Sequence, residues 1–477
     1  MTDQPAAGAS ADAATAAGAS GAAPRTGTWG VDEHLADILA RVSALPPVEL
    51  GLLEAHGCLL AEDVVAGGDL PPFDNSSMDG YAVRAADLDG ACAAAPVVLA
   101  VVGDIAAGAG ELPEVGRGQC ARIMTGAPLP PGADAVVPVE WTDGETGTGR
   151  PADRMLPVAD LPTRDAGQRA GGEVRVLRPA APGAHVRGRG GDVTAGTLVL
   201  PAGTRLGPAQ LGLAAAVGRG SLRVRPRPRV AVLSTGSELV EPGTPLGPGR
   251  ITDSNSFALT AAAREAGADA RRIAGVPDDP ERLRAVLAEL LPEVDALVTS
   301  GGVSVGAYDV VKDALSGSGG GPAGALGGME FRKLRMQPGK PQGFGLLDGG
   351  RVPLFALPGN PVSAYISFEL FVRPAIRAMA GETGERRYRP VVRARLTAPM
   401  RSPEGRRQYA RGRYLPESGT VEPEGGAGSH LVGALARADA LIVVPEEATA
   451  LAAGDTVETV LLGAEPAGWT GLRPDQR

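Results

Sequence analysis

The chain has 477 residues, which is too long for one ordinary domain and indicates three or four. Its formal net charge of −9 argues against nucleic acid as the main partner, because binding to phosphate backbones requires a basic face. No run approaches the ~20 apolar residues that cross a membrane, and three cysteines without a CxxC pair fit a reducing cytoplasm.

The first half of the chain is predicted to be a helix-containing lobe that carries an inserted β region. Apolar residues at helical spacing predict a helix over 31–42, and a second short helix is predicted over 48–55. From about 63 to 178, short apolar runs broken by Gly and Pro predict strands without helices. A strand at 198–200 and a helix over 208–217 then return the chain to the first lobe.

The second half is predicted to be an α/β domain followed by a small β domain. After a proline-rich linker at 226–229, strands and helices alternate until a helix over 362–379, which is typical of a doubly wound α/β domain. The predicted strands are 230–234, 269–276, 295–299 and 329–335, and the preceding helices are 254–266, 279–291 and 309–315. From Tyr388 onward, short alternating runs predict a separate β domain with strands at 391–396, 441–444 and 456–461.

Three Gly-rich turns each follow an apolar strand of the predicted α/β domain. They contain Ser234, Thr235 and Gly236; Ser300, Gly301, Gly302 and Ser304; and Pro358, Gly359 and Asn360. Glycines let a backbone approach a ligand closely, and free N–H groups beside a helix start attract anions. One such turn is often an ordinary strand-to-helix connection. Three of them, at the carboxyl ends of strands in one domain, predict a phosphate-bearing ligand at one edge of the sheet.

Charged residues near these turns have two open interpretations. Asp309 follows the second turn, and Asp253 precedes a predicted helix. Either carboxylate fits a Mg²⁺ ligand against phosphate oxygens, and either fits a helix N-cap. Lys333 and Lys340 flank the Pro-Gly turn of MQPGKP (336–341). They either bind a tetrahedral oxyanion as point charges or are solvated lysines at strand ends.

A dense polar loop, PPFDNSSMDGY (71–81), interrupts the predicted β region. Its short polar side chains, Asp79 among them, suggest a second face of a site, although a loop that satisfies its own hydrogen bonds is the alternative. The segment RIMTG similarly offers Thr125 at a strand end. Four scattered histidines, and the absence of GxSxG and GxxxxGK[ST], argue against zinc catalysis, an α/β-hydrolase and a P-loop NTPase.

Taken together, these segments resemble the molybdopterin molybdenumtransferase family, which includes the bacterial MoeA proteins and the E domain of gephyrin. The similarity runs from about residue 30 to 465 and follows the family's order of motifs. It rests on PPFDNSSMDGYAV (71–83), RIMTGAPLPPGADAVVPVE (122–140), VAVLSTGSEL (230–239), DALVTSGGVSVGAYDVVK (295–312), MQPGKP (336–341) and LPGNPVSA (357–364), together with a long match over 188–218.

The resemblance implies a multidomain α/β and β protein with a MoeA-like fold. It would contain a doubly wound α/β molybdopterin-binding domain, an elongated inserted β domain and a C-terminal β-barrel-like domain. The corresponding boundaries are a disordered tail at 1–28, an N-terminal lobe at 29–68 and 188–225, the elongated β domain at 69–187, the α/β domain at 226–383, the C-terminal β domain at 387–465 and a tail at 466–477. Family members are homodimers, with the active site between the α/β domain of one chain and the β arm of the other.

The resemblance also implies an enzyme, a molybdopterin molybdenumtransferase. Its reaction would be the Mg²⁺-dependent insertion of molybdenum from molybdate into adenylyl-molybdopterin, which releases AMP and forms molybdenum cofactor. A cytoplasmic location is implied, with a molybdopterin adenylyltransferase and the receiving apo-molybdoenzymes as partners.

Residue roles follow from the matched motifs. The implied catalytic residues are Asp79, Thr125, Asp309, Lys333 and Lys340. The implied substrate-binding residues are Ser234, Thr235, Gly236, Asp253, Ser300, Gly301, Gly302, Ser304, Pro358, Gly359 and Asn360. The implied molybdate pocket is formed by Lys340, Pro341, Ser363, Arg406 and Ser429, and the implied metal ligands are Asp309 and Asp253.

Three positions depart from the family pattern. Many relatives have an acid where this chain has Gly191, an Asp where it has Ser237, and a basic residue where it has Gln337. These departures weaken a two-carboxylate metal site built on Ser237, and they leave Arg332 or Arg335 as candidates for the missing positive charge. Two further hypotheses stay open: a scaffold protein that keeps the fold for assembly, and a tungsten-directed paralogue.

Overall fold

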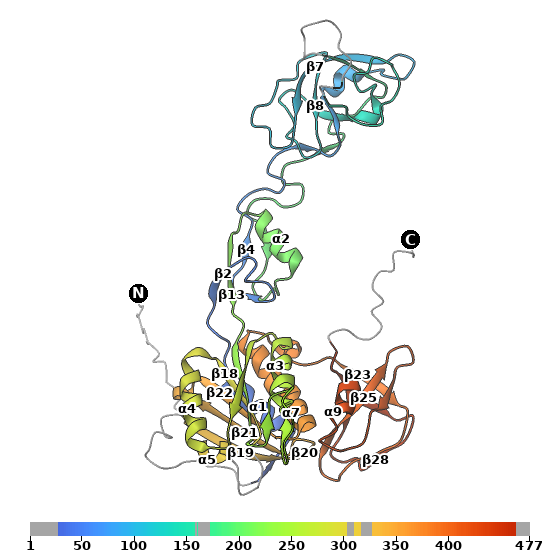
Figure 1. Cartoon of the computed structure of the whole chain (residues 1–477). Helices are drawn as coiled ribbons and strands as arrows, with labels where there is room; N and C mark the ends of the chain where they lie inside the picture. Colours follow the sequence, from blue (N-terminus) through green and yellow to red (C-terminus); the bar gives the residue numbers. More distant parts are fainter. Residues whose placement is uncertain (1–26, 158–159, 161–171, 303–309, 316–326, 464–477) are drawn as a thin grey trace, which may run out of the picture.

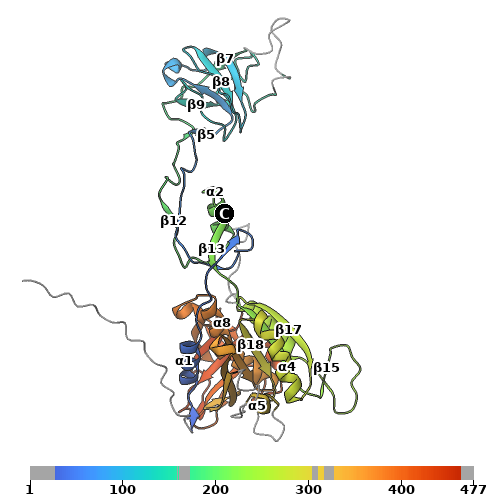
Figure 2. The same ribbon diagram turned by 90° about the vertical axis from the view of Figure 1, so that its left-hand side faces the viewer.

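The computed structural model describes residues 27–157, 160, 172–302, 310–315 and 327–463. The described chain is elongated, as Figure 1 and Figure 2 show. A distal domain (residues 75–187) lies at one end and a middle lobe (48–65 and 198–225) follows it. An α/β domain (28–41 and 229–379) and a C-terminal domain (391–461, with residues 336–337) lie together at the other end.

A seven-stranded sheet in the order β1-β19-β21-β22-β18-β14-β17 forms the centre of the α/β domain. Its strands β17, β14, β18 and β22 are parallel, and β21 and β19 continue the sheet in antiparallel fashion. The strands are β1 Thr28–Trp29, β14 Arg229–Thr235, β17 Asp269–Val276, β18 Ala296–Ser300, β19 Gly327–Leu334, β21 Pro341–Leu347 and β22 Val352–Leu357. A short parallel pair, β15 Leu239–Val240 and β16 Ile251–Thr252, lies outside this sheet.

Helices cover both faces of this sheet, because nearly continuous runs of Val, Leu and Ala in parallel strands cannot face water. One face is covered by α1 Val31–Arg41, α3 Asn255–Glu265, α7 Pro361–Ser367 and α8 Arg373–Met379. The other is covered by α4 Pro280–Leu290 and α5 Val310–Leu315. The predicted strand–helix alternation is confirmed, and a π-helical turn at Phe368–Val372 joins α7 to α8. None of the helices in the described ranges is long and apolar enough to cross a membrane.

Two predictions for the first 60 residues are wrong. The helix predicted over 48–55 is instead the strand β2 Val48–Gly51, followed by turns. Its backbone hydrogen-bonds to β13 Ser221–Arg225, a partner that local helical spacing does not reveal. The helix at 31–42 is confirmed, but it does not lie in the N-terminal lobe as assigned. β1 pairs with β19, and α1 packs in the core of the α/β domain.

The middle lobe is small and built around one apolar cluster. It contains the sheet β2-β13-β3, the pair β4–β12 and one helix, with β3 Leu59–Leu60, β4 Val64–Val65, β12 Leu198–Leu200 and α2 Pro208–Ala216. The predicted return of the chain at 198–200 and 208–217 is therefore confirmed. β4 leads away toward the distal domain and β12 leads back beside it, so the distal domain enters and leaves through neighbouring strands.

The distal domain is a five-stranded sheet in the order β10-β7-β8-β6-β9, with an apolar cluster on each face. Its strands are β6 Gly80–Val83, β7 Val97–Ile105, β8 Gln119–Ile123, β9 Ala135–Pro138 and β10 Glu173–Val176, and the pair β5 Asn75–Ser76 and β11 Val186–Arg187 stands at its base. The residues described between 63 and 178 include short 3₁₀ turns, at 85–88 and 139–141 among others, and no α-helix, as predicted.

The C-terminal domain is a small closed barrel. Its sheet runs β20-β25-β26-β23-β29-β27, and β27 pairs back with β25 to close it. The strands are β20 Met336–Gln337, β23 Val391–Leu396, β25 Arg407–Leu415, β26 Thr420–Pro423, β27 Ala440–Val444 and β29 Thr456–Leu461, with α9 Val432–Arg437 and the pair β24 Met400–Arg401 and β28 Ala450–Leu451 beside them. The barrel-like expectation is thus confirmed, and β20 joins the barrel directly to the end of β19.

The direction of the parallel strands fixes where a site can form. β13 of the middle lobe leads through residues 226–228 straight into the start of β14 at Arg229. The amino ends of β14, β18 and β22 therefore face the middle lobe, and their carboxyl ends face away from it. Ligands of open α/β sheets bind at the carboxyl edge, which here is the edge farther from the distal domain.

Candidate functional site

The three predicted glycine turns meet at the carboxyl edge of the sheet. Ser234 pairs with Ser300, and Ser300 pairs with Leu357, so β14, β18 and β22 end side by side. Gly301 has φ +99°, and a Cβ there would lie 2.7 Å from the Thr235 carbonyl oxygen. The Gly301 N–H donates to the Leu357 carbonyl at 3.1 Å. Close packing of the first and second turns therefore requires glycine at this position.

Asn255, which the sequence interpretation did not single out, links two of these turns. Its amide nitrogen donates to the Ser300 hydroxyl and to the Gly359 carbonyl, both at 2.7 Å. The Ser300 hydroxyl in turn donates to the Pro358 carbonyl at 3.3 Å. Asn255 is the first residue of α3, two residues after the predicted Asp253, and a polar amide at a helix start beside Gly-rich turns was the available signal.

The end of β14 holds hydroxyl groups without partners. Ser234 and Thr235 are buried, and neither hydroxyl hydrogen-bonds within the part of the chain that the structure describes. A buried hydroxyl without a hydrogen bond is costly, so such groups commonly await a ligand or ion. Both residues belong to the first predicted glycine turn and lie at the carboxyl edge of the sheet.

Asp253 lies just before Ser254, the N-cap residue of α3, and its side chain bonds to the first turn of that helix. Its two carboxylate oxygens accept hydrogen bonds from the backbone N–H and the hydroxyl of Ser256. The Arg272 guanidinium is also 3.6 Å from one of these oxygens. Of the two interpretations of Asp253, the geometry therefore favours the cap. Asp309 and Ser304, by contrast, lie outside the described residues.

Side chains from β21 and α7 hold the lysine turn at 336–341 in place. The Gln342 amide donates to the Gly339 carbonyl at 2.7 Å and to the Ser367 hydroxyl at 2.6 Å. Gly339 has φ +99°, and a Cβ there would be 2.8 Å from the Ser367 hydroxyl oxygen. Lys340 is exposed at the tip of this fixed turn.

Lys333 lies beside the same turn. It pairs with Pro341 in the β19–β21 ladder and is exposed like Lys340. The backbone N–H of Leu334 donates to the Lys340 carbonyl at 2.7 Å, which closes the turn. Both predicted lysines are therefore available to solvent at one end of the hairpin.

Residues of the C-terminal domain reach this region. Arg406 donates to the Gln337 side chain at 3.4 Å, and the Ser429 carbonyl accepts from the Val362 N–H at 3.0 Å. Ser363, the next residue of α7, is buried, and Asn360 precedes that helix as its exposed N-cap. The structure thus brings two predicted molybdate residues of the barrel next to the lysine turn and the start of α7.

Charged residues lie beside Gln337 and Ser237, two of the positions that differ from the family pattern. Arg406 brings a positive charge to Gln337, whereas Arg332 is buried in ion pairs with Asp37 and Glu330 at 2.7 and 2.6 Å. Arg335 donates to the Thr28 carbonyl at 3.1 Å. The suggested compensation by Arg332 is therefore wrong. At Ser237, the backbone N–H donates to the Asp278 carboxylate at 2.8 Å, so an acid is present beside the first turn.

The Gly191 turn at the base of the distal domain carries no buried acid. The Gly191 N–H donates to the Gly188 carbonyl at 3.0 Å, and Asp192 is exposed. In the neighbouring polar loop, the Asp74 carboxylate accepts from the Arg189 N–H at 2.7 Å and the Ser76 hydroxyl donates to the Met78 carbonyl at 2.6 Å. The polar side chains of this loop therefore bond partly within the loop and partly to Arg189 in the neighbouring turn.

Asp79 and Thr125 lie together at the base of the distal domain. The Thr125 N–H and hydroxyl both donate to the same Asp79 oxygen, at 2.7 and 2.8 Å. Gly80 pairs with Ile123, so the two residues project from adjacent ends of β6 and β8. Both are exposed.

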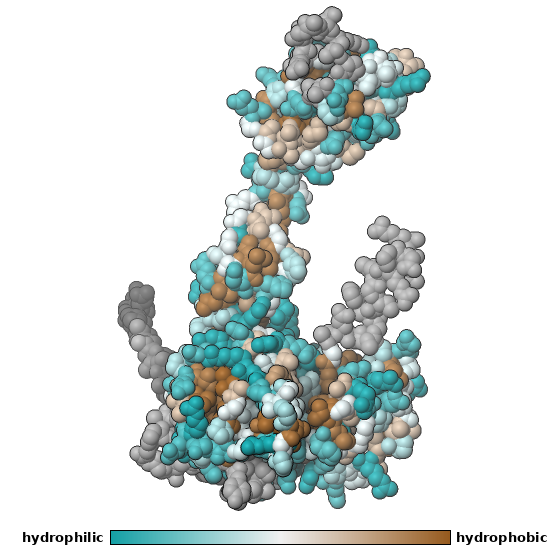
Figure 3. All heavy atoms as spheres, in the orientation of Figure 1, coloured by the Kyte–Doolittle hydropathy of each residue, from teal (hydrophilic) through white to brown (hydrophobic). Residues whose placement is uncertain are grey.

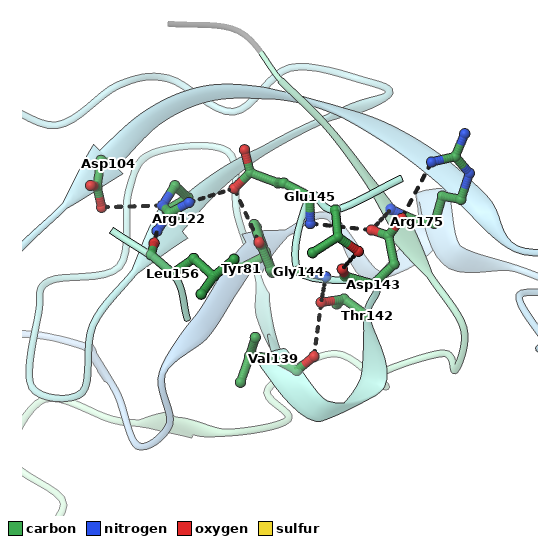
Figure 4. Close-up of polar contacts among 11 residues, drawn as sticks. Tyr81, Asp104, Arg122, Val139, Thr142, Asp143, Gly144, Glu145, Leu156 and Arg175 are labelled. Carbon is green, nitrogen blue, oxygen red and sulfur yellow. Dashed lines mark hydrogen bonds and ion pairs between the residues drawn. The ribbon is translucent and has the colours of Figure 1, made fainter. Parts of the chain in front are cut away.

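A buried polar network holds these strand ends (Figure 4). Arg122 pairs with Glu145 at 2.8 Å, lies 3.8 Å from Asp104 and donates to the Leu156 carbonyl. The Tyr81 hydroxyl donates to the same Glu145 carboxylate at 3.0 Å. Burial, and then the Glu145 charge, raise the pKa of Tyr81, so the phenol stays a neutral donor. The network fixes Tyr81, which is close to Asp79 in sequence, and Arg122, which is close to Thr125.

A single chain does not bring all the predicted residues together. The Asp79–Thr125 pair belongs to the distal domain, beyond the middle lobe (Figure 1). The glycine turns lie at the sheet edge that faces away from that lobe. The two faces of the predicted site are therefore separated within one chain.

Three family descriptions match nearly the whole described chain. Residues 29–218 match the MoeA N-terminal region (domain I and II), 231–378 a probable molybdopterin binding domain, and 393–462 the MoeA C-terminal region (domain IV).

Individual relatives agree. The chain is 44% identical over 428 residues to molybdopterin molybdenumtransferase 2 of Mycobacterium tuberculosis, covering 90% of this chain and 98% of that protein. It is 38% identical over 454 residues to molybdopterin molybdenumtransferase 1 of the same species, covering 91% and 98%. A solved structure of the molybdopterin biosynthesis MoeA protein of Pyrococcus horikoshii is similar with a TM-score of 0.69 at 32% identity, covering 92% of this chain and 100% of that one.

Proposed function

The chain belongs to the MoeA family of molybdopterin molybdenumtransferases, and we propose on that premise that it transfers molybdenum from molybdate into adenylyl-molybdopterin and releases AMP. Membership makes it an enzyme of molybdenum cofactor biosynthesis that inserts molybdenum. The identity of the nucleotide substrate and the release of AMP are the proposed part.

The observation that carries this proposal is the contact between the three glycine turns. They offer backbone N–H groups, the unpartnered hydroxyls of Ser234 and Thr235 and a rigid Asn255 link at one sheet edge. A pterin bearing a diphosphate and an adenosine needs such an edge, because closely packed backbone donors bind phosphate oxygens without a fixed counter-charge.

The neighbouring lysine turn is suited to molybdate. Molybdate is a tetrahedral dianion, which requires positive charge and several donors in a small space. We assign this role to Lys340, Pro341, Ser363, Arg406 and Ser429. The contacts of Arg406 with Gln337 and of Ser429 with Val362 support this assignment, because they hold the barrel against the turn and α7.

We propose that the active enzyme is a homodimer in which Asp79 and Thr125 of one protomer complete the site of its partner. The separation of these residues from the glycine turns within one chain supports this arrangement. A two-fold dimer would create two equivalent sites. A molybdopterin adenylyltransferase that supplies the substrate and apo-molybdoenzymes that receive the product, all in the cytoplasm, complete the proposal.

Mg²⁺ is proposed as the cofactor, with Asp309 as its ligand. Asp253 does not fit this role, because Ser256 engages both of its oxygens and the Arg272 guanidinium lies 3.6 Å away. Bound beside a phosphoanhydride, Mg²⁺ would supply charge neutralisation.

The test is an assay of AMP release from adenylyl-molybdopterin with Mg²⁺, in the presence and absence of molybdate. We expect release to require molybdate, to fall at least about tenfold in Lys340→Ala, and to stop with a chelator. Arg395→Ala, an exposed arginine on β23, serves as the control and should behave like the wild type. Nucleotide binding without AMP release would instead support the scaffold hypothesis.

A further inference from the structure

A cavity lies on the side of the α/β domain opposite to the glycine turns. It has a volume of about 1210 Å³ and forms where residues 201–205 of the chain leading from β12 to α2, the helix α8 and residues 382–391 meet. Figure 3 shows a mostly hydrophilic surface where the middle lobe meets the α/β domain. Glu265, at the end of α3, lines this cavity, whereas Asn255 at the start of α3 contacts the glycine turns. An 11-residue helix spans about 16 Å, so the two sites are distinct.

The lining of this cavity is rich in arginine. Five arginines line it against three glutamates, Glu265, Glu382 and Glu385. The arginines are Arg205, Arg373, Arg377, Arg386 and Arg389. Glu369 also pairs with Arg389, so five guanidinium groups are set against four carboxylates and one positive charge is in excess.

The pairing within the cluster identifies which arginine is left with only one long ion pair. Arg389 binds Glu369 through two hydrogen bonds, at 2.8 and 3.1 Å, and also pairs with Glu265 at 2.7 Å. Arg205 and Arg377 share one oxygen of Glu382. Both carboxylate oxygens of Glu369 thus accept hydrogen bonds from Arg389, and the Arg373 Nε lies 3.8 Å from one of these oxygens.

Arg373 is consequently a buried cation with unused donors. The residue is 8% exposed, and neither its Nε nor its Nη1 makes a hydrogen bond within the described part of the chain. Burial lowers the pKa of Arg373; Glu369 opposes this, and the charge of Arg389 adds to the lowering. Burial also lowers the pKa of Arg377, against the opposing effect of Glu382. An anion in the cavity would relieve the repulsion between the arginines and offset the charge of Arg373.

We propose that this cavity binds the phosphate group of a small organic phosphate, with Arg373 and Arg377 as its main ligands and Arg386 at the exposed side. Planar guanidinium groups match the geometry of phosphate oxygens and bind them in pairs. The volume exceeds what a free phosphate ion fills, which leaves room for the rest of the ligand. This site is separate from the glycine turns and would not take part in the insertion reaction.

Calorimetric titration of the full chain with inorganic phosphate, pyrophosphate and AMP tests the proposal. We expect saturable binding, weakened roughly tenfold or more by Arg373→Met. Only the component of binding that Arg373→Met removes is assigned to the cavity, because AMP is also the proposed product at the glycine turns. A tighter Arg373-dependent affinity for AMP than for phosphate would identify an organic phosphate as the ligand class, and the reverse order would overturn that part. The titrations are repeated in Lys340→Ala, which disables the other anion site, so that the binding that remains in this variant belongs to the cavity. Arg393→Ala, an exposed arginine on β23, is the matched control.

Thermal unfolding separates binding from a structural role. If Arg373 awaits an anion, Arg373→Met should be at least as stable as the wild type without phosphate, and phosphate should raise the melting temperature of the wild type by more than that of the variant. Unchanged phosphate binding by Arg373→Met, or the absence of saturable binding in the wild type, would overturn the proposal. Should Arg373→Met fail to fold, Arg386→Ala, at an exposed position, must show the weakened binding instead.

Discussion

At the scale of single residues, Asn255 joins two glycine turns with one side chain. Replacement by alanine leaves the Ser300 hydroxyl and the Gly359 carbonyl without this donor. The loss should cost about 1–3 kcal/mol of stability and raise the KM for the nucleotide substrate. Melting temperature and AMP-release kinetics measure the two effects. Asn360→Ala removes an exposed amide with no capping hydrogen bond, so its melting temperature should not change.

Gly301 offers a second test at this scale. Gly301→Ala forces a Cβ to within 2.7 Å of the Thr235 carbonyl at φ +99°. We expect a loss of about 1–3 kcal/mol and weaker nucleotide binding. Gly212→Ala, in the middle of α2 with open space around it, should instead stabilise the chain by about 0.5–1 kcal/mol. Equal destabilisation by both substitutions would show that the close packing of the turns is unimportant.

His34 predicts a dependence of stability on pH. Burial, and then the Arg332 charge, lower its pKa to about 3, and Arg332 donates to its Nδ1 at 3.0 Å. The folded chain therefore holds His34 neutral, while the unfolded chain protonates it below its usual pKa of 6.5. Stability is present above that value and falls by about 1 kcal/mol between pH 6.5 and about pH 5.5.

Denaturant titrations at the two pH values, followed by far-UV circular dichroism, measure this change. His34→Gln keeps a hydrogen-bond acceptor for Arg332 but cannot be protonated, so its stability should change less over the same range. An identical pH dependence in both proteins would exclude His34 as the cause.

At the scale of elements, sequence patterns predicted the strands, helices and turns that neighbouring residues determine. Periodicity located β14, β17, β18 and the helices between them, and the glycine motifs located the edge where three turns meet. The segment 48–51 was mispredicted because its partner, β13, lies about 170 residues away. The sequence pattern assigns α1 to the N-terminal lobe, whereas its apolar face packs in the core of the α/β domain. Neighbouring residues in the sequence do not reveal where such a face packs.

The candidate site shows the same limit. Ser300 and Gly359 were predictable from their motifs, whereas the role of Asn255 depends on which turns the fold brings within reach of it. Gln342 and Ser367 hold the lysine turn from positions whose sequence context gives no sign of it. The unused donors of Arg373 likewise depend on the fold, because Arg389 binds both oxygens of Glu369 and leaves Arg373 only a long ion pair with it.

At the scale of the whole molecule, the proposed dimer can be tested by mixing two inactive variants. Asp79→Ala disables the distal face, and Lys340→Ala disables the molybdate face. If each site combines two protomers, random exchange makes about half of the dimers mixed, and each mixed dimer has one intact site. The mixture should therefore recover about a quarter of wild-type AMP release.

The unmixed variants, and a mixture without subunit exchange, are the controls. Analytical ultracentrifugation verifies that the subunits associate. No recovery despite exchange would place Asp79 and Lys340 in separate functions, or both within one protomer's site.

The pairing of β4 with β12 also bears on how the molecule is assembled from parts. The Ala66 N–H donates to the Thr197 carbonyl, and the Gly196 N–H donates to the Ala66 carbonyl, both at 2.9 Å. The two ends of the 67–195 segment are thus already as close as the ends of a hairpin loop. Replacing that segment with a short turn should leave a shortened chain that folds and binds nucleotide but releases no AMP. The distal domain can therefore be removed without taking any strand from the sheets of the other domains.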